Sequence, residues 1–154
     1  MSPDEVRAVA KSLDGLGPMV WALALSGMRR GEYWGKWEVW QDRYRIFGTK
    51  TEAAVRDVPY LGPIVAPSCT YNPFRKKLKT VRPDVSPHDF RHTYMHWMDE
   101  AGISRIRRKL YLGHASGDVS DIYDRHEITG FLVTDAARLR EYIGDIPTPL
   151  RKVG

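Results

Sequence analysis

The feature that most constrains the fold is an unbroken apolar run from Met19 to Leu25, which Pro18 introduces. A helix that is apolar on all sides is buried, and proline is favoured in a first helical turn. We therefore expect residues 18–25 to form a buried helix. A chain of 154 residues, 42% of them hydrophobic, is long enough to enclose that helix within one compact domain.

Capping patterns predict further helices. Ser2-Pro3-Asp4-Glu5 has the form of a capping box, and Ser86-Pro87-His88-Asp89 repeats the cap followed by proline. They predict an opening helix and a helix that runs to about Glu100. Ser104 is expected to cap another helix, which ends near Leu112. A last amphipathic helix is predicted by a stripe that consists of Leu132, Ala136, Leu139 and Ile143.

Between Lys36 and Ile64 the composition shifts to aromatic and β-branched residues in short runs, separated by turn-forming segments. Such runs predict a small antiparallel sheet of two or three strands. From Leu61 to Asp84, four prolines predict a stretch that is largely loop, with a short helix over residues 74–78. The expected fold class is therefore α+β and mainly α, with helices around one small sheet.

The composition also argues against several classes of protein. No stretch approaches the roughly 20 apolar residues of a membrane span, and the N-terminus lacks the order of a signal peptide. The single cysteine, Cys69, cannot form an internal disulfide or a cysteine-rich metal site, as is usual in a reducing compartment. These features predict a soluble, cytoplasmic protein that has no membrane partner.

The net charge of +5 favours a polyanionic partner. Basic residues gather in two segments, where they can contact successive phosphates and release counterions. The candidate phosphate contacts are Arg75, Lys76, Lys77, Lys79, Arg105, Arg107 and Arg108. Because charged runs are also common on solvated helix faces, charge alone leaves nucleic-acid binding open.

Five motifs and a tyrosine follow one another along the chain. They are Ser26-Gly27-Met28-Arg29-Arg30-Gly31-Glu32, Gly48-Thr49-Lys50-Thr51, Arg56-Asp57-Val58-Pro59, Pro87-His88-Asp89-Phe90-Arg91-His92-Thr93, Leu112-Gly113-His114-Ala115-Ser116 and, nine residues after His114, Tyr123. In this order and spacing they resemble the catalytic boxes of tyrosine recombinases of the phage-integrase family.

The resemblance covers nearly the whole chain. It implies a catalytic domain over residues 1–144, a tail at 145–154, and the absence of the N-terminal domain with which family members clamp DNA. It implies double-stranded DNA as the partner, a homotetramer on DNA, a monomer or weak oligomer without DNA, and a place beside the nucleoid of a bacterial or phage-infected cell. The catalytic residues that it assigns are Arg29, Lys50, His88, Arg91, His114 and the nucleophile Tyr123.

Phosphodiester chemistry gives these residues the same roles. Negative charge grows on the non-bridging oxygens, where Arg29 and Arg91 offer permanently charged donors. A phosphotyrosine conserves the energy of the broken bond, so cleavage can be reversed by rejoining. Lys50 can protonate the departing deoxyribose oxygen, while the histidines can accept the phenolic proton or bind a phosphate oxygen. Because cationic side chains do the work of a metal, no cofactor is expected.

Other functions remain open at this point. A type IB topoisomerase shares the tyrosine chemistry but relaxes one duplex, and a DNA-binding fragment without its missing domain would be inactive. His88, His92 and His96 lie at helical spacing, which leaves a metal-dependent phosphohydrolase as a third alternative. Besides these, we expect Glu32 to pack or form a salt bridge behind the arginine site, and tryptophans 37 and 40 to lie in the core.

Overall fold

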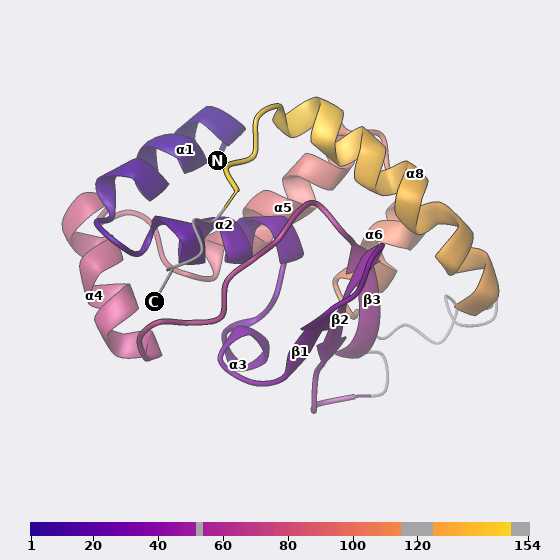
Figure 1. Cartoon of the computed structure of the whole chain (residues 1–154), viewed down its shortest axis with the longest axis horizontal. Coiled ribbons are helices and arrows are strands. Elements are labelled where there is room, and N and C mark those ends of the chain that lie inside the picture. Colours follow the sequence, from indigo (N-terminus) through magenta and orange to yellow (C-terminus); the bar gives the residue numbers. More distant parts are fainter. Residues whose placement is uncertain (52–53, 115–124, 149–154) are drawn as a thin grey trace.

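The computed structural model describes residues 1–51, 54–114 and 125–148. Figure 1 shows helices packed beside one small sheet, so the expected fold class, α+β and mainly α, is confirmed. The elements are α1 (Pro3–Ser12), α2 (Gly17–Ser26), α3 (Arg30–Tyr33), β1 (Trp37–Val39), β2 (Arg43–Phe47), β3 (Val55–Pro59), α4 (Tyr71–Val81), α5 (Asp89–Glu100), α6 (Arg105–Tyr111) and α8 (Arg125–Ile143).

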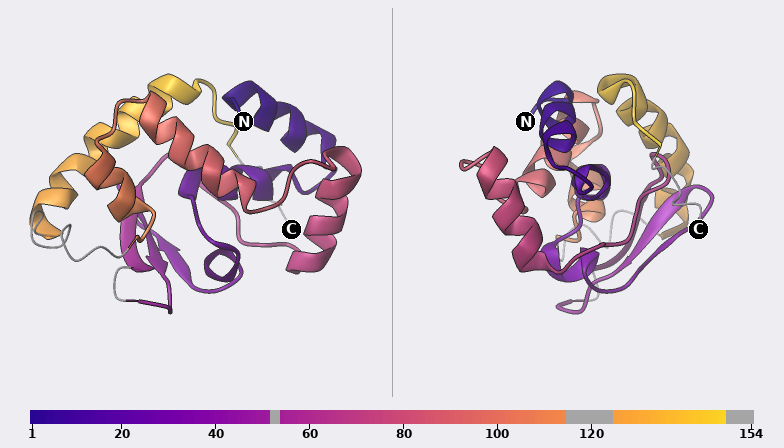
Figure 2. Two further views of the ribbon diagram at one scale, coloured as in Figure 1. Left: turned by 180° about the vertical axis from the view of Figure 1, so that it is seen from behind. Right: turned by 60° about the vertical axis from the view of Figure 1, so that its left-hand side comes forward.

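The central helix is α2, as its composition predicts. Every residue from Met19 to Ser26 is buried, and α2 packs against both α1 and α5. Figure 2 shows from behind how α5 runs across the middle of the molecule beside α2. The helix ends at Gly27, whose φ of 65° suits glycine. A Cβ there would lie 2.4 Å from the ring of Tyr94, so α2 and α5 can approach closely only with glycine at this position.

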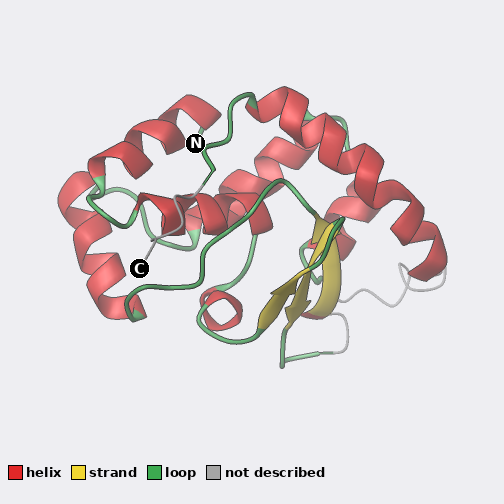
Figure 3. Ribbon diagram, in the orientation of Figure 1, coloured by secondary structure: helices red, strands yellow, loops and turns green. Residues whose placement is uncertain are grey.

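The sheet has three antiparallel strands in the order β1-β2-β3 (Figure 3). Its inner face contributes Tyr44, Ile46 and Val58 to the core, as the alternation of the strands predicts. The outer face carries an ion pair between Arg45 and Asp57, which are cross-strand neighbours.

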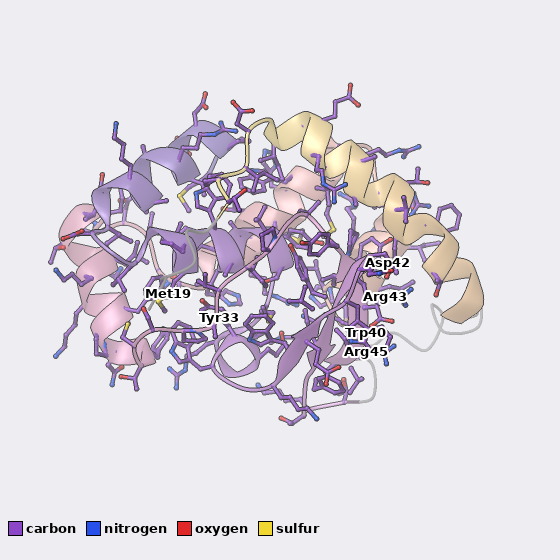
Figure 4. The ribbon with its side chains drawn as sticks, in the orientation of Figure 1. Met19, Tyr33, Trp40, Asp42, Arg43 and Arg45 are labelled. Carbon is purple, nitrogen blue, oxygen red and sulfur yellow. The ribbon has the colours of Figure 1, made fainter. Side chains whose placement is uncertain are left out.

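The predicted core position of Trp37 and Trp40 is right in part. Trp37 is half-buried and packs against the core, whereas Trp40 is 43% exposed. The ring of Trp40 lies 4.2 Å from the guanidinium of Arg45, and Figure 4 shows it on the same side of the sheet as Arg43 and Arg45. The correction follows from strand alternation: Trp37 lies opposite the buried Ile46, and a residue three positions later faces the other side of the sheet.

The stretch predicted to be largely loop contains a longer helix than expected. Residues 71–81 form α4, whereas the sequence indicated helix only over 74–78. Pro73 lies in the first turn, where no intrahelical bond to its nitrogen is required. Phe74 and Leu78, one turn apart, are both fully buried and anchor the helix to the core.

A buried ion pair joins α6 to the last helix. Arg107 donates to Asp135 of α8 at 2.8 Å, and the hydroxyl of Tyr111 donates to the same carboxylate at 2.6 Å. The predicted apolar stripe of α8 is confirmed, since all four of its residues are buried. Beyond α8, Arg7 donates to the carbonyl of Asp145 and Ile146 packs against the core. Within the described ranges, no helix is long and apolar enough to cross a bilayer.

Candidate active site

The first arginine motif forms the corner between α2 and α3. Arg29 is extended and precedes the short helix, where the carboxylate of Glu32 binds it twice. The backbone N–H of Arg29 donates to Oε2 at 2.8 Å, and its Nη1 donates to Oε1 at 3.1 Å. The side chain is still 32% exposed. One carboxylate thus orients Arg29 while part of its guanidinium faces solvent.

Glu32 is itself held by a second arginine. Nη1 and Nη2 of Arg56 in β3 each donate to one carboxylate oxygen of Glu32 at 2.9 Å. Burial would raise the pKa of Glu32, but the hydrogen bonds and charge of Arg56, together with Arg29, hold it below its usual value. The expectation of a salt bridge behind the arginine site is therefore confirmed.

Sequence reasoning assigned no role to Arg56, although a signal was present. Arg56 and Val58 alternate in β3, and Arg56 pairs with the buried Ile46 across the sheet, so its side chain belongs to the core face. A charged side chain on a core face needs a buried partner of opposite charge. Glu32 is that partner, but no local pattern in the sequence connects the two residues.

Arg91 occupies the first turn of α5 and is only 6% exposed. Its Nη1 donates to the carbonyl of Gly27 at 2.7 Å, and its Nη2 donates to the carbonyl of Leu112 at 2.5 Å. Arg91 therefore joins the ends of α2 and α6. Burial lowers its pKa to about 10, and the charges of Arg29 and Arg56 add to this effect. Arg91 nevertheless remains charged at neutral pH.

The two predicted catalytic histidines border this arginine cluster. His88 is exposed just before α5, and His114 is exposed just after α6. Partial burial lowers the pKa of both imidazoles. The charges of His92 and Arg91 lower the pKa of His88 further. The charges of Arg91 and Arg29 do the same to the pKa of His114. The structure thus brings His88, His114, Arg29 and Arg91 together. Neutral histidines beside cationic arginines can accept a proton or bind an anionic oxygen.

The lowered histidine pKa values give a prediction for pH dependence. Protonation in the folded state requires a pH below the usual histidine value of 6.5. A reaction that needs a neutral imidazole should slow as the pH falls below that value. The free energy of unfolding should also decrease there, because the unfolded chain then binds more protons.

Urea unfolding between about pH 8 and pH 5 tests the second expectation, and single-turnover rates of the DNA cleavage that the motifs predict test the first. We expect His88→Gln and His114→Gln to weaken the pH dependence of the cleavage rate within the folded population. A wild-type rate that stays constant or rises toward pH 5 would contradict the role of neutral histidines.

Of the remaining two predicted catalytic residues, the structure describes only Lys50. Lys50 is exposed in the loop between β2 and β3, which agrees with a hairpin location. Tyr123 lies in the segment 115–124, outside the residues that the structure describes. The described chain ends on either side of that segment at His114 and Arg125.

The basic residues of α4 occupy its solvent side. Arg75, Lys76 and Lys77 are exposed, and Lys79 donates to the carbonyl of Pro83. At its start, α4 lies against the arginine corner. The guanidinium of Arg30 lies 4.3 Å from the ring of Tyr71.

The basic residues of α6 divide into different environments. Arg105 is exposed, and Arg108 is an ion-pair partner of Asp99. The prediction that Arg107 contacts phosphate is wrong, because its guanidinium is buried in the ion pair with Asp135. A buried, paired guanidinium cannot reach a phosphate without losing that pair.

No metal-binding group of three or more histidine, cysteine or acidic side chains occurs within residues 1–51, 54–114 and 125–148. The rings of His88 and His92 are in contact, with their centroids 4.8 Å apart.

Comparisons of this chain with protein-family models, with curated proteins and with solved structures each found no match.

Proposed function

We propose that this chain is the catalytic domain of a site-specific DNA recombinase, which cleaves and rejoins double-stranded DNA through a 3′-phosphotyrosine at Tyr123. It would act on DNA as a homotetramer. The observation that carries the proposal is the gathering of two arginines and two histidines of lowered pKa from separate parts of the chain. Arg29, Arg91, His88 and His114 share one electrostatic site.

This site suits a phosphodiester better than a neutral substrate. The pentacoordinate transition state carries growing charge on its non-bridging oxygens, and guanidiniums held in place before the reaction stabilise that charge without reorganisation. Arg29 is oriented by Glu32 and still partly exposed. Arg91 donates two of its N–H groups to backbone carbonyls, and its other N–H groups have no hydrogen-bond partner among the described residues.

The order of the motifs along the chain also supports the proposed function. Tyr123 follows His114 at the spacing of the recombinase family, and Lys50 lies in the hairpin loop that the resemblance assigns to the general acid. In the proposed reaction a neutral histidine takes the phenolic proton of Tyr123 and the phenol oxygen attacks phosphorus. The bond from phosphorus to the deoxyribose 5′-oxygen breaks, and that oxygen leaves with a proton from Lys50. Reversal of these steps on a new 5′-hydroxyl rejoins the strands.

The test is formation of a covalent protein–DNA complex. Nicked duplexes, from which the cleaved fragment can diffuse away, are incubated with the protein in the presence of a chelator and separated on a denaturing gel. We expect a band of reduced mobility that resists boiling in detergent and disappears after protease treatment. Strand cleavage that the chelator abolishes, without a covalent band, would overturn the proposal in favour of a metal-dependent hydrolase.

A second prediction concerns the basic face of α4. Each phosphate contact that is lost should reduce the slope of log affinity against log salt by about 1. We therefore expect Lys77→Gln to weaken DNA binding at low salt and to flatten its salt dependence. Arg138→Gln removes one charge from an exposed position on α8 and is the matched control. Equal effects of the two substitutions in binding titrations would show that α4 is not a specific contact surface.

A further inference from the structure

Arg56 connects the corner that carries Arg29 to the end of α6, where Arg91 is also bound. Its side chain is 4% exposed and extends from β3. Besides its two bonds to Glu32, Arg56 donates through Nε to the carbonyl of Tyr111 at 2.7 Å and through Nη1 to the carbonyl of Ala54. Four of its five N–H donors are thus used within the protein.

The contacts at the end of α6 show why this connection matters. The carbonyl of Tyr111 accepts from Arg56, and the carbonyl of the next residue, Leu112, accepts from Arg91. Two consecutive carbonyls therefore anchor two arginines, at the helix end where the macrodipole favours positive charge. From Arg56 the chain of contacts continues through Glu32 to Arg29.

We propose that Arg56 is a positioning residue, which fixes the guanidinium of Arg29 relative to that of Arg91. The inference rests on the proposed function, in which both guanidiniums bind the same phosphate. Arg56 does not touch the DNA, because it is buried and its donors bond to Glu32 and to backbone carbonyls. It acts by holding Glu32, whose carboxylate orients the backbone and the side chain of Arg29.

A lysine at position 56 keeps the charge but cannot reproduce the planar fork that binds both oxygens of Glu32. A shift of about 1 Å in a positioned group can slow a reaction by about 100-fold. We therefore expect Arg56→Lys to slow covalent-complex formation at saturating DNA by about 10-fold to 100-fold. Its affinity for DNA should remain within about twofold of wild type, because no phosphate contact is lost.

Arg107→Lys is the matched control. Arg107 also forms a buried ion pair through two nitrogens, but its partner is Asp135 and not Glu32, the carboxylate that orients Arg29. Both lysine variants should be less stable than wild type. Within the folded population, we expect Arg107→Lys to form the covalent complex at the wild-type rate. An equal loss of rate in both variants would reduce Arg56 to a structural residue and overturn the inference.

A double substitution separates the positioning of Arg29 from a general loss of stability. In an Arg29→Lys background, Arg56→Lys should cause little additional loss of rate, because the group that it positions is already altered. Full additivity of the two losses would contradict the inference. Glu32→Gln weakens the same connection from its other partner and replaces Arg56→Lys if that variant does not fold.

The NMR signal of the Arg29 Nε–H group provides a readout that needs no activity. In free protein, we expect Arg56→Lys to shift and broaden this signal and Arg107→Lys to leave it unchanged. An unchanged signal in Arg56→Lys would refute the positioning role. If wild-type protein forms no covalent complex while the signal responds as expected, the proposed function fails and the positioning of Arg29 stands.

Discussion

Replacing Tyr123 by phenylalanine is expected to abolish formation of the covalent protein–DNA complex. The substitution removes a single oxygen, the proposed nucleophile, and loss of a nucleophile in a concerted site costs more than about 10⁴-fold in rate. DNA affinity should change by less than about twofold, because the basic residues that we expect to contact phosphate are retained. Single-turnover reactions on nicked DNA, followed on denaturing gels, measure the rate.

Tyr111→Phe is the matched control for this prediction. The hydroxyl of Tyr111 is buried and donates to Asp135, so its loss should lower the free energy of unfolding by about 1.5–3 kcal/mol. Folded Tyr111→Phe protein should still form the covalent complex. The assignment of Tyr123 fails if its phenylalanine variant keeps activity, or if Tyr111→Phe alone loses it.

The second large effect is expected at Arg91, where stability and activity should fall together. Arg91→Ala leaves the carbonyls of Gly27 and Leu112 without their donors. An unsatisfied buried polar group costs about 1–3 kcal/mol, so the free energy of unfolding should decrease by about 2–6 kcal/mol for the two. Covalent-complex formation should become undetectable even at temperatures where the variant is folded.

Arg29→Ala provides the contrast. Glu32 keeps its bidentate partner Arg56 in this variant, and Arg29 is partly exposed, so the stability loss should stay below about 1 kcal/mol. Activity should nevertheless be lost as fully as in Arg91→Ala. Urea unfolding measures the stability of both variants, and the covalent-complex assay measures their activity. Similar stability losses in both variants would show that the assigned difference between the arginines is wrong.

The parts of the fold that the sequence predicts are those that local pattern determines. The uninterrupted apolar run defines α2, and capping residues mark where α1 and α6 begin. The sheet follows from strand alternation. The sequence predicts too short a helix at α4 because a proline in a first turn looks the same in sequence as a proline in a loop. The burial of Phe74 and Leu78 shows that this proline belongs to a helix.

The candidate site also has parts that the sequence predicts and parts that it does not. The order of the motifs predicts which residues gather, and the structure brings Arg29, Arg91 and the two histidines together. The roles of Arg56 and Arg107 depend on partners that are distant in sequence, Glu32 and Asp135. A run of basic residues carries no information about which member turns inward, so the sequence predicts a phosphate contact for Arg107 as well as for its neighbours.

The central claim is that Tyr123 becomes covalently joined to DNA, and peptide mapping of the complex tests it most directly. Wild-type protein is trapped on a nicked duplex in chelator, and the complex is digested with nuclease and trypsin. Cleavage after Lys109 and Arg125 yields a peptide that contains both Tyr111 and Tyr123. We expect fragmentation spectra to locate a nucleotide, joined through its 3′-phosphate, on Tyr123. A nucleotide on Tyr111 or on another residue, or DNA cleavage that leaves every peptide unmodified, would contradict it.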